Sequence, residues 1–535
     1  MKKRGTRLLG LLMVVFLLMS LVMIGCETSP AEPDDDADVA PETDLKVLRV
    51  ALNTVPLTVD PANHRHRNTQ TLVRNWTDAL TQQMPDGRHI LDIAETITEI
   101  DPLTYEIEIR EGIVFHNGDP MTADDVIFSF QRIAIEGGME GETSPRSPLA
   151  GPIESVDKID DYKVVVNLSS PNPIQDTRWY NIEIMPKNYF EEVGIDGFLE
   201  QPIGVGPFKW VEGDFTTQVI LERHEDYYGG APELPGEVDR IPAVDRVIFS
   251  FIPESTTRVA ALLAGEVDII QDVPFDSIEL LENNPNINVV STPGTNVVYM
   301  AFNTTRAPFN DKRVRQAIGH AIDYDLITSA QLLGYSDPLK GLPFLEAYEG
   351  SPGHGQFGGL QPYDYDPDKA MALLEDAGIS GFATVIDTTS EFNEQAQLVA
   401  QMLGDVGIEA SVRVWDLAVL QEATQNGERD IYFGRHGNAA KAPQWIEQIT
   451  GTGRPNNFAL YSNPAFDEMI ETAIAMDDSP ERNALFMEAF EVIMDELPVL
   501  TLHNPQVVEA SLAHVKNFYP SATGRVNLHR VDIEQ

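Results

Sequence analysis

The sequence predicts a large α/β protein with two or more lobes. Its 535 residues are 42% hydrophobic, enough to form more than one core. Strand patterns also alternate with helix patterns. Tyr105, Ile107 and Ile109 alternate with charged residues, as in a half-buried strand, and a capped helix follows them. Residues 253–270 then read as a helix ended by Gly265 and a short buried strand.

Residues 1–25 have the features of a signal peptide. A positively charged start precedes an apolar run at residues 8–24, and Gly25 and Cys26 follow. Cys26 is the single cysteine of the chain, and the pattern resembles a bacterial lipoprotein signal. We expect export, with Cys26 lipidated and the protein held at the cell membrane, facing the periplasm or the cell exterior. The alternative is an uncleaved anchor, because the run is near the lower limit for spanning a bilayer.

The segment 26–45 is rich in carboxylates, proline, alanine and threonine, which predicts a disordered tether. No later segment is long and apolar enough to span a membrane. The formal charge of −47 disfavours nucleic acid as a partner, because phosphate binding depends on lysine and arginine.

Residues 105–132 carry the most informative motif of the body. After the strand, Asn117 to Pro120 supply a turn. Thr122 can then cap a helix that has Asp124 and Asp125 in its first turn. This segment closely resembles the signature of the family 5 extracellular solute-binding proteins, the receptors of dipeptide, oligopeptide and nickel ABC importers.

Further similarities are spread along the chain. Residues 48–62 resemble the first strand and turn of the family, and residues 202–208 resemble its glycine-rich turn. The glycine-rich turn is not a nucleotide loop, because no lysine followed by serine or threonine stands at the required spacing. Residues 253–270 form a unit common in bilobal receptors, and residues 311–323 also match, with one apolar helical face.

The resemblance implies a bilobal periplasmic-binding-protein type II fold with an extra subdomain in the first lobe. Lobe one would comprise residues 46–274 and 503–535, with the subdomain at about 65–185, and lobe two residues 275–502. A small solute would bind between lobes that close by hinge motion, and a membrane permease would recognise the closed form. A monomer without a cofactor is expected.

Peptide-binding members hold the peptide ammonium with a tryptophan, a variable residue and an aspartate in lobe two. The corresponding segment here is residues 430–445. Asn438 falls at or near the aspartate position and Arg435 replaces the aromatic residue. An amide lacks the charge that makes a hydrogen bond to ammonium strong, so the sequence predicts that the usual clamp is missing.

Positive residues stand in two segments that lie near the ligand cleft in this family, the run His64 to Arg67 in lobe one and the set Arg435, His436 and Lys441 in lobe two. Arginine matches carboxylate, phosphate or sugar-acid groups bidentately, which predicts an anion-binding role. The alternative is that these residues lie on solvated loops and balance the surrounding acid. Trp445 can stack on the solute, whereas the other tryptophans are expected in the core. The predicted ligand-binding set is Asn53, Arg65, Arg67, Arg435, His436, Asn438, Lys441 and Trp445.

Other site types have weaker support. His64 and His66 could contact a metal or metal chelate, but no third ligand accompanies them. Acidic residues between Asp364 and Glu375 have partial calcium-loop spacing, yet the required glycine is Lys369 and the pattern favours a helix with Asp366 as N-cap.

Enzyme motifs such as HExxH and GxSxG are missing from the sequence. The sequence therefore predicts an importer receptor for a peptide or peptide-like solute rather than an enzyme. An anionic or sugar-type solute is the alternative. A lipid-anchored secreted hydrolase is a weaker one, and a second role in adhesion or as a chaperone stays open.

Overall fold

The structure is a computed structural model that describes residues 45–534, with gaps at 84–88, 173–174, 230–240, 343–359, 438–441 and 477–478. The expected signal peptide, Cys26 and nearly all of the expected tether lie outside the described residues, as do Asn438 and Lys441. Within the described part of the chain, no helix has the length and apolarity needed to cross a membrane.

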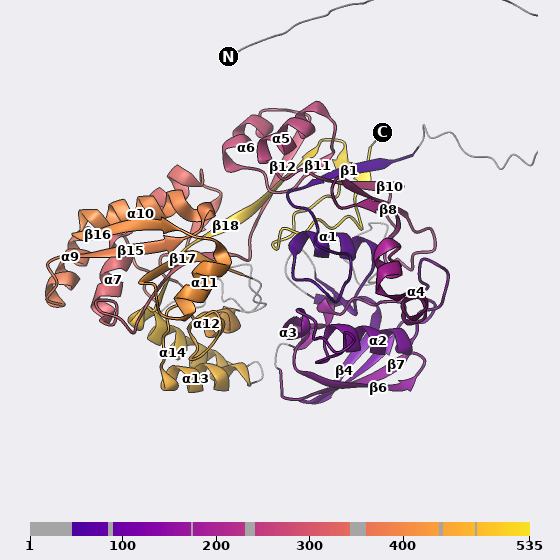
Figure 1. Ribbon diagram of the computed structural model, residues 1–535, viewed down its shortest axis with the longest axis horizontal. Helices are drawn as coiled ribbons and strands as arrows, with labels where there is room; N and C mark the ends of the chain where they lie inside the picture. The colour runs from indigo at the N-terminus through magenta and orange to yellow at the C-terminus, as the bar shows by residue number, and fades with distance from the viewer. Residues whose placement is uncertain are drawn as a thin grey trace, which may run out of the picture. The chain divides into compact units, whose positions relative to one another are not determined.

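One half of the main sheet is built around β1 (Val47–Leu52). It pairs in parallel with β10 and β11, and antiparallel neighbours extend the sheet beyond β10. Three helices, α1, α5 and α6, belong to this half (Figure 1). Its other elements are β8 (Phe208–Asp214), β9 (Gln218–Arg223), β10 (Arg246–Phe251), β11 (Ile269–Ile270), α1 (Arg67–Trp76), α5 (Ser255–Ala264) and α6 (Phe275–Glu282).

A separate sheet, in the order β4-β5-β7-β6, lies between α1 and β8 in the sequence. The predicted strand β5 (Thr104–Ile109) alternates buried and half-buried residues, as its pattern requires. Thr122 donates its backbone N–H to Asp125 (2.9 Å) at the start of α2 (Ala123–Ile133), which confirms the predicted helix start. The other elements of this region, from β2 to η3, are β2 (Thr81–Gln83), β3 (His89–Leu91), β4 (Ala94–Asp101), β6 (Ile153–Asp160), β7 (Lys163–Leu168), α3 (Ser147–Ala150), η2 (Gln175–Thr177) and η3 (Trp179–Asn181). The helix α4 (Lys187–Glu200) follows and leads back to β8.

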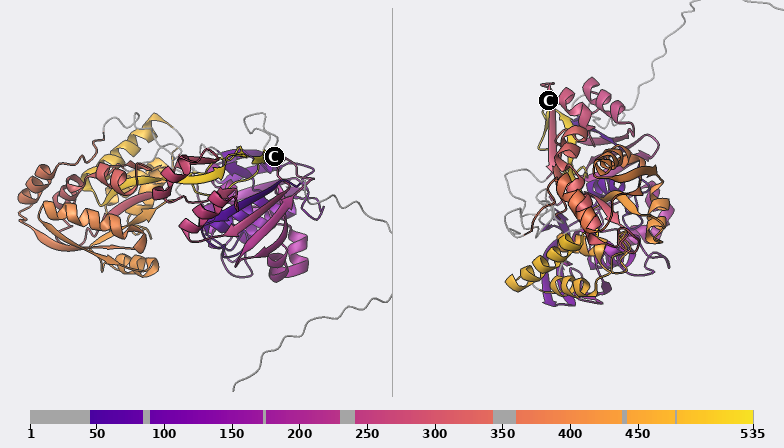
Figure 2. Two further views of the ribbon diagram at one scale, coloured as in Figure 1. Left: turned by 90° about the horizontal axis from the view of Figure 1, so that it is seen from above. Right: turned by 90° about the vertical axis from the view of Figure 1, so that its left-hand side faces the viewer.

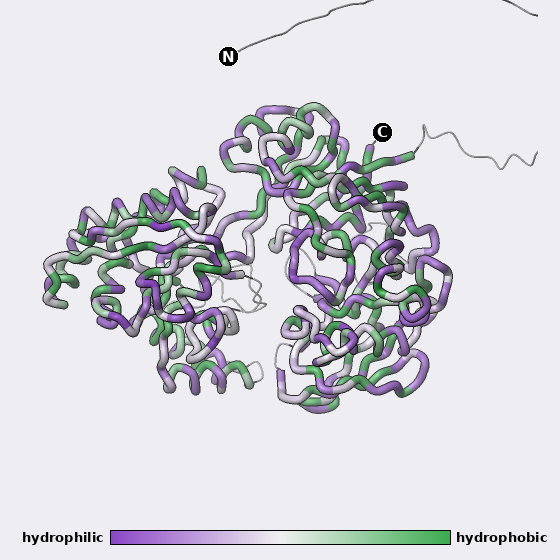
Figure 3. The backbone as a smooth tube through the Cα atoms, viewed as in Figure 1, coloured by the Kyte–Doolittle hydropathy of each residue, from purple (hydrophilic) through white to green (hydrophobic). Residues whose placement is uncertain are grey.

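The other half of the main sheet contains β13 (Val297–Phe302), whose six residues are all buried. Val298, Met300 and Phe302 belong to one hydrophobic core, while Val297, Tyr299 and Ala301 belong to another. A strand with both faces covered needs a continuous apolar run, which explains this sequence. Figure 3 shows short hydrophobic and hydrophilic stretches alternating along the backbone of both halves.

Helices cover both faces of this half (Figure 1). The predicted apolar face of α7 packs into the first of the two cores. In α9, Asp366 accepts a hydrogen bond from Lys369 N (3.0 Å), which confirms the helix in place of a calcium loop. The elements are β15 (Phe382–Thr388), β16 (Ile408–Val414), β17 (Ile431–His436), α7 (Lys312–Ala321), α8 (Tyr324–Leu326), η4 (Ile327–Gln331), α9 (Pro367–Asp376), η5 (Ser390–Phe392), α10 (Asn393–Asp405), α11 (Leu417–Gln425), α12 (Ala442–Thr450), α13 (Pro464–Ile474) and α14 (Pro480–Glu496).

The two halves share one long strand, β18 (Val499–Leu512). Its first residues pair with β13, and its last seven pair with β12 (Ile287–Pro293). The short strand β14 (Ser336–Pro338) pairs with residues 503–505 of β18. After β18, the strands β19 (Val515–Lys516) and β20 (Asp532–Ile533) form an antiparallel pair. Figure 2 shows β18, in yellow, running from one half to the other. Each half is therefore a lobe, and the chain crosses between them at β12–β13 and again within β18.

The crossings suggest a lobe boundary different from the one expected at residue 275. Helix α6 and strand β12 pack in one core with Ala51, Val508 and Ala510. These contacts join them to the β1 half. We therefore propose that lobe two begins after Gly294, where β12 ends, and that α6 and β12 belong to lobe one.

Candidate functional site

The predicted lobe-two residues Arg435 and His436 end strand β17. This strand pairs with β13 through Val298↔Arg435 and Val297↔His436, and successive residues of a strand face opposite sides. Arg435 is exposed and forms an ion pair with Glu391 (2.9 Å). Its guanidinium therefore already has a carboxylate partner.

His436 lies on the other side, against aromatic residues. Its ring centroid is 6.4 Å from that of Trp445, which is 6.2 Å from that of Tyr299 in an edge-on contact. Burial, together with the charge of Arg65, lowers the pKa of His436 to about 4. The imidazole is therefore neutral near pH 7.

We call Tyr299, His436 and Trp445 the aromatic wall. Three of its polar atoms have no hydrogen-bond partner among the described residues. They are His436 Nδ1, Trp445 Nε1 and Tyr299 Oη. Buried polar groups are rarely left unpaired, because each costs about 1–3 kcal/mol. Trp445 lies in α12, and both Trp445 and Tyr299 are fully enclosed and contribute to the core.

The predicted lobe-one residues Asn53 and Arg67 lie together around Asp272. Arg67 forms an ion pair with Asp272, and the Asn53 side-chain amide donates to the same carboxylate. Asn68 in turn donates to Asn53 Oδ1 (2.9 Å). These polar groups satisfy one another, which favours the alternative role of balancing nearby acid over direct capture of an anion.

Of the predicted set, the structure brings Arg65 within electrostatic reach of His436 and joins Asn53 to Arg67. Arg435 is engaged by Glu391 on its own lobe. Asn438 and Lys441 lie outside the described residues, so the proposed loss of the ammonium clamp stays a prediction.

His64 lies in a buried cluster instead of on an exposed loop. The Arg146 guanidinium contacts His64 Nε2 (2.9 Å) and donates to Glu183 and to Asn181 O (3.0 Å). Burial and the charge of Arg146 lower the pKa of His64 to about 2. No group of three or more metal-ligating side chains occurs in the described residues.

More arginines meet at the same cluster. Arg74 contacts Glu183 (3.0 Å), and the guanidiniums of Arg74 and Arg525 lie 5.3 and 5.7 Å from the ring centre of Tyr180. Tyr180 is only half-buried, as are Arg178 and Arg525. The cluster therefore extends from a buried ion pair to the surface of lobe one. We call Arg74, Arg146, Arg178, Arg525, Glu183 and Tyr180 the arginine cluster.

Sequence reasoning missed the arginine cluster because its members are far apart along the chain. Arg74 lies in the last turn of α1, Arg146 and Arg178 directly precede α3 and η3, and Arg525 lies between β19 and β20. Three of its six members lie within residues 178–183, and the other three lie at positions 74, 146 and 525. His64 was the one signal of this cluster in the sequence, because it lies within the positively charged run at residues 64–67.

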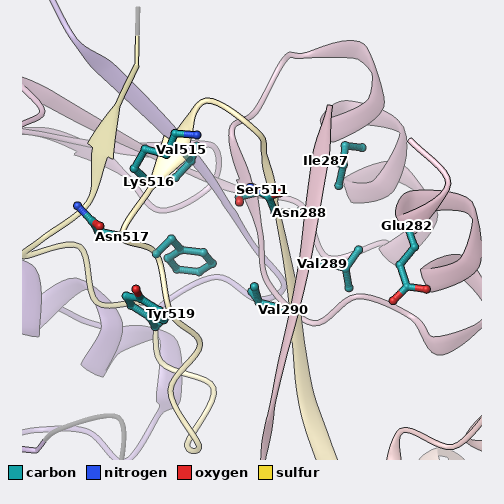
Figure 4. Close-up of a pocket in the computed structure, with 11 residues that line it drawn as sticks. Glu282, Ile287, Asn288, Val289, Val290, Ser511, Val515, Lys516, Asn517 and Tyr519 are labelled. Carbon is teal, nitrogen blue, oxygen red and sulfur yellow. The ribbon is translucent and has the colours of Figure 1, made fainter. Parts of the chain in front are cut away.

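A cavity of about 490 Å³ lies elsewhere, along β12 and β18 (Figure 4). Glu282, Val289 and Val290 line one side, and Phe518 and Tyr519 the other. None of the predicted ligand-binding residues that the structure describes lines this cavity.

Comparison with known proteins identifies the family. The model of the bacterial extracellular solute-binding proteins, family 5 Middle, matches residues 90–457. A glutathione-binding protein of Pectobacterium atrosepticum is 25% identical over 498 residues, covering 88% of this chain and 91% of the relative. The dipeptide-binding protein of Escherichia coli is 26% identical over 472 residues, covering 81% and 84%.

The fold agrees with that assignment. The structure of HbpA2 from Haemophilus parasuis superposes with a TM-score of 0.81 at 25% identity, covering 91% of this chain and all of the other. The predicted bilobal fold is therefore confirmed. The chain belongs to the bacterial extracellular solute-binding proteins of family 5, which are binding components of ABC transporters and not enzymes.

Proposed function

We propose that the protein captures a peptide or peptide-like solute between its two lobes and delivers it to the permease of an ABC importer. The observation that carries this proposal is the pair of adjacent crossings at β12–β13 and β18. Two neighbouring strands form a hinge that allows one closing direction. A solute that contacts both lobes only when they are closed shifts the population toward the closed state.

The peptide class is supported by the relatives. The relatives named above are a dipeptide-binding and a glutathione-binding protein.

An anionic or sugar-type solute is the second candidate. It is favoured by the arginine cluster, which carries more cationic than anionic groups in a chain of charge −47. The two candidates overlap, because every free peptide also ends in a carboxylate.

Thermal unfolding of residues 27–535 tests the proposal. The matched panels are free peptides, N-acetylated peptides, sugar acids and neutral oligosaccharides. A ligand at about a hundred times its dissociation constant should add roughly 2.7 kcal/mol of stability. Stabilisation by peptides supports the peptide class, whereas stabilisation by sugar acids or oligosaccharides alone would replace it with the second candidate.

We also propose that the exported chain is anchored through a lipid on Cys26, with the acidic segment after it acting as a tether. The sulfur of Cys26 is the single thiol available for acylation. We predict that Cys26→Ser moves the protein from the membrane fraction to the soluble fraction and abolishes incorporation of labelled fatty acid. Unchanged labelling of Cys26→Ser would contradict the anchor.

A further inference from the structure

We propose that the arginine cluster of lobe one is a binding subsite for a carboxylate of the solute, with Arg525 and Arg178 as the residues that contact it. This inference rests on the proposed function and makes it more specific, because it assigns the solute an anionic end and places that end on lobe one. None of the contacting residues belongs to the predicted ligand-binding set.

The cluster contains more guanidinium groups than carboxylates that can balance them. Glu183 contacts both Arg74 (3.0 Å) and Arg146 (2.9 Å), so one buried carboxylate faces two guanidiniums. Arg74 also lies near Asp78 and Asp92, but burial raises the pKa of both carboxyls, which favours their neutral forms. Arg178 has Asp176 nearby, and Arg525 hydrogen-bonds the hydroxyl of Tyr180. The cluster therefore keeps an excess of positive charge.

Tyr180 responds to the positive charges around it. Burial by itself would raise the pKa of this phenol, yet the charges of Arg525, Arg74 and Arg178 lower it. A phenol whose ionisation is favoured despite burial lies in a strongly positive potential. The same potential would stabilise a carboxylate that approaches the hydroxyl.

The cluster has unused hydrogen-bonding capacity. Arg146 Nε has no partner among the described residues, and Arg146 is 1% exposed. Arginine presents donors in a planar fork that matches a carboxylate bidentately. Arg178 and Arg525 are partly exposed to solvent, whereas the ion-paired Arg146 and Glu183 are buried.

A purely structural role is the competing explanation, in which the cluster ties the C-terminal segment to the region around η3. That role requires no ligand. It predicts that loss of Arg525 lowers stability equally with and without an anion, and this difference makes the inference testable.

The first experiment measures thermal stabilisation of the mature chain by succinate, with its neutral diamide succinamide as the matched probe. Sodium chloride at equal ionic strength controls for general salt effects. We expect succinate to stabilise the wild type more than succinamide does. We expect Arg525→Gln to weaken the apparent affinity for succinate at least tenfold, and Arg525→Lys to restore part of it.

Arg223→Gln is the control variant, because Arg223 is a lobe-one arginine paired with Asp245 (3.0 Å) and Glu225 (2.9 Å) outside the cluster. It should leave the response to succinate unchanged. Equal succinate responses in the wild type and Arg525→Gln would overturn the subsite. Arg525-dependent binding of inorganic phosphate without binding of succinate would overturn its assignment to a carboxylate.

The second experiment follows Tyr180 directly by phenolate absorbance, taking the difference between the wild type and Tyr180→Phe. We expect this tyrosine to ionise below the ordinary value of about 10 and to shift upward when succinate binds. A titration that succinate leaves unmoved would overturn the inference, even if Arg525→Gln fails to fold.

The outcomes separate this inference from the proposed function. If free and C-terminally amidated peptides bind equally well and succinate does not bind, the receptor function stands and the carboxylate subsite fails. If succinate binds through Arg525 while every peptide is ignored, the subsite stands and the peptide class fails.

Discussion

At the residue scale, the feature with the clearest energetic consequence is Glu509 on β18. It is fully buried, and neither carboxylate oxygen has a hydrogen-bond partner among the described residues. Burial and the negative charge of Asp272 raise its pKa well above the ordinary value. The folded state therefore favours the protonated carboxyl more strongly than the unfolded state does.

The raised pKa of Glu509 determines how the stability of the folded state changes with pH. A carboxyl whose pKa is raised on folding costs stability as pH rises from its ordinary pKa toward the raised one, because the folded state resists ionisation. We predict that Glu509→Gln is more stable than the wild type at pH 8 by about 1–3 kcal/mol, the cost of an unsatisfied buried polar group. The advantage should shrink at pH 5.

Urea unfolding at pH 5 and pH 8 measures this difference. Glu409→Gln is the matched control, because Glu409 also lies on a strand but is exposed. A Glu509→Gln variant that is less stable than the wild type at pH 8 would show that the carboxylate has a stabilising partner.

At the element scale, the glycine-rich turn at residues 202–208 shows why its glycines are needed. Gly206 N donates to Trp76 O (3.1 Å), so the turn lies directly against the end of α1. A Cβ on Gly206 would meet the Trp76 backbone at 2.6 Å. The turn therefore fixes the end of the helix that carries Arg74.

We predict that Gly206→Ala lowers the free energy of unfolding by about 1–3 kcal/mol, the usual cost of overpacking. Gly404→Ala is the control, because Gly404 lies in helix α10 with nothing near its missing Cβ. That change should stabilise by up to about 1 kcal/mol. Equal effects of the two substitutions in a denaturant titration would contradict the close approach.

The crossing between the lobes depends on one buried amide. Asn504 donates to Gly294 O (2.9 Å) and to Asn296 O (2.7 Å), which ties β18 to the link between β12 and β13. We predict that Asn504→Ala increases hydrogen exchange at residues 294–297 and leaves β15 and β16 unchanged. Faster exchange throughout lobe two would indicate general destabilisation instead of a loosened hinge.

Periodicity and capping predicted elements such as β5, α2, α7 and α9 because these depend on residues close in sequence. The arginine cluster could not be predicted, since it joins residues from 74 to 525 through the fold. The ion-pair partners of the predicted arginines could not be predicted from the sequence either. Asp272 and Glu391 are distant in sequence from Arg67 and Arg435.

At the scale of the whole molecule, the proposed function requires a hinge that closes when a solute binds. The continuous sheet permits this motion, because β18 belongs to both lobes and the other crossing, from β12 to β13, lies beside β18 (Figure 1). Closure needs no global unfolding, only backbone rotation at a few residues between the paired segments. The solute sets the equilibrium by its differential affinity for the two states.

The most direct test is a distance measurement between the lobes. Residues 27–535 contain no cysteine, so Glu154→Cys on β6 and Glu468→Cys on α13 can carry spin labels at exposed positions. We predict that a ligand found by thermal stabilisation shortens and narrows the distance distribution, whereas a non-binding analogue does not. A saturating ligand that stabilises the protein but leaves this distribution unchanged would contradict closure around the solute.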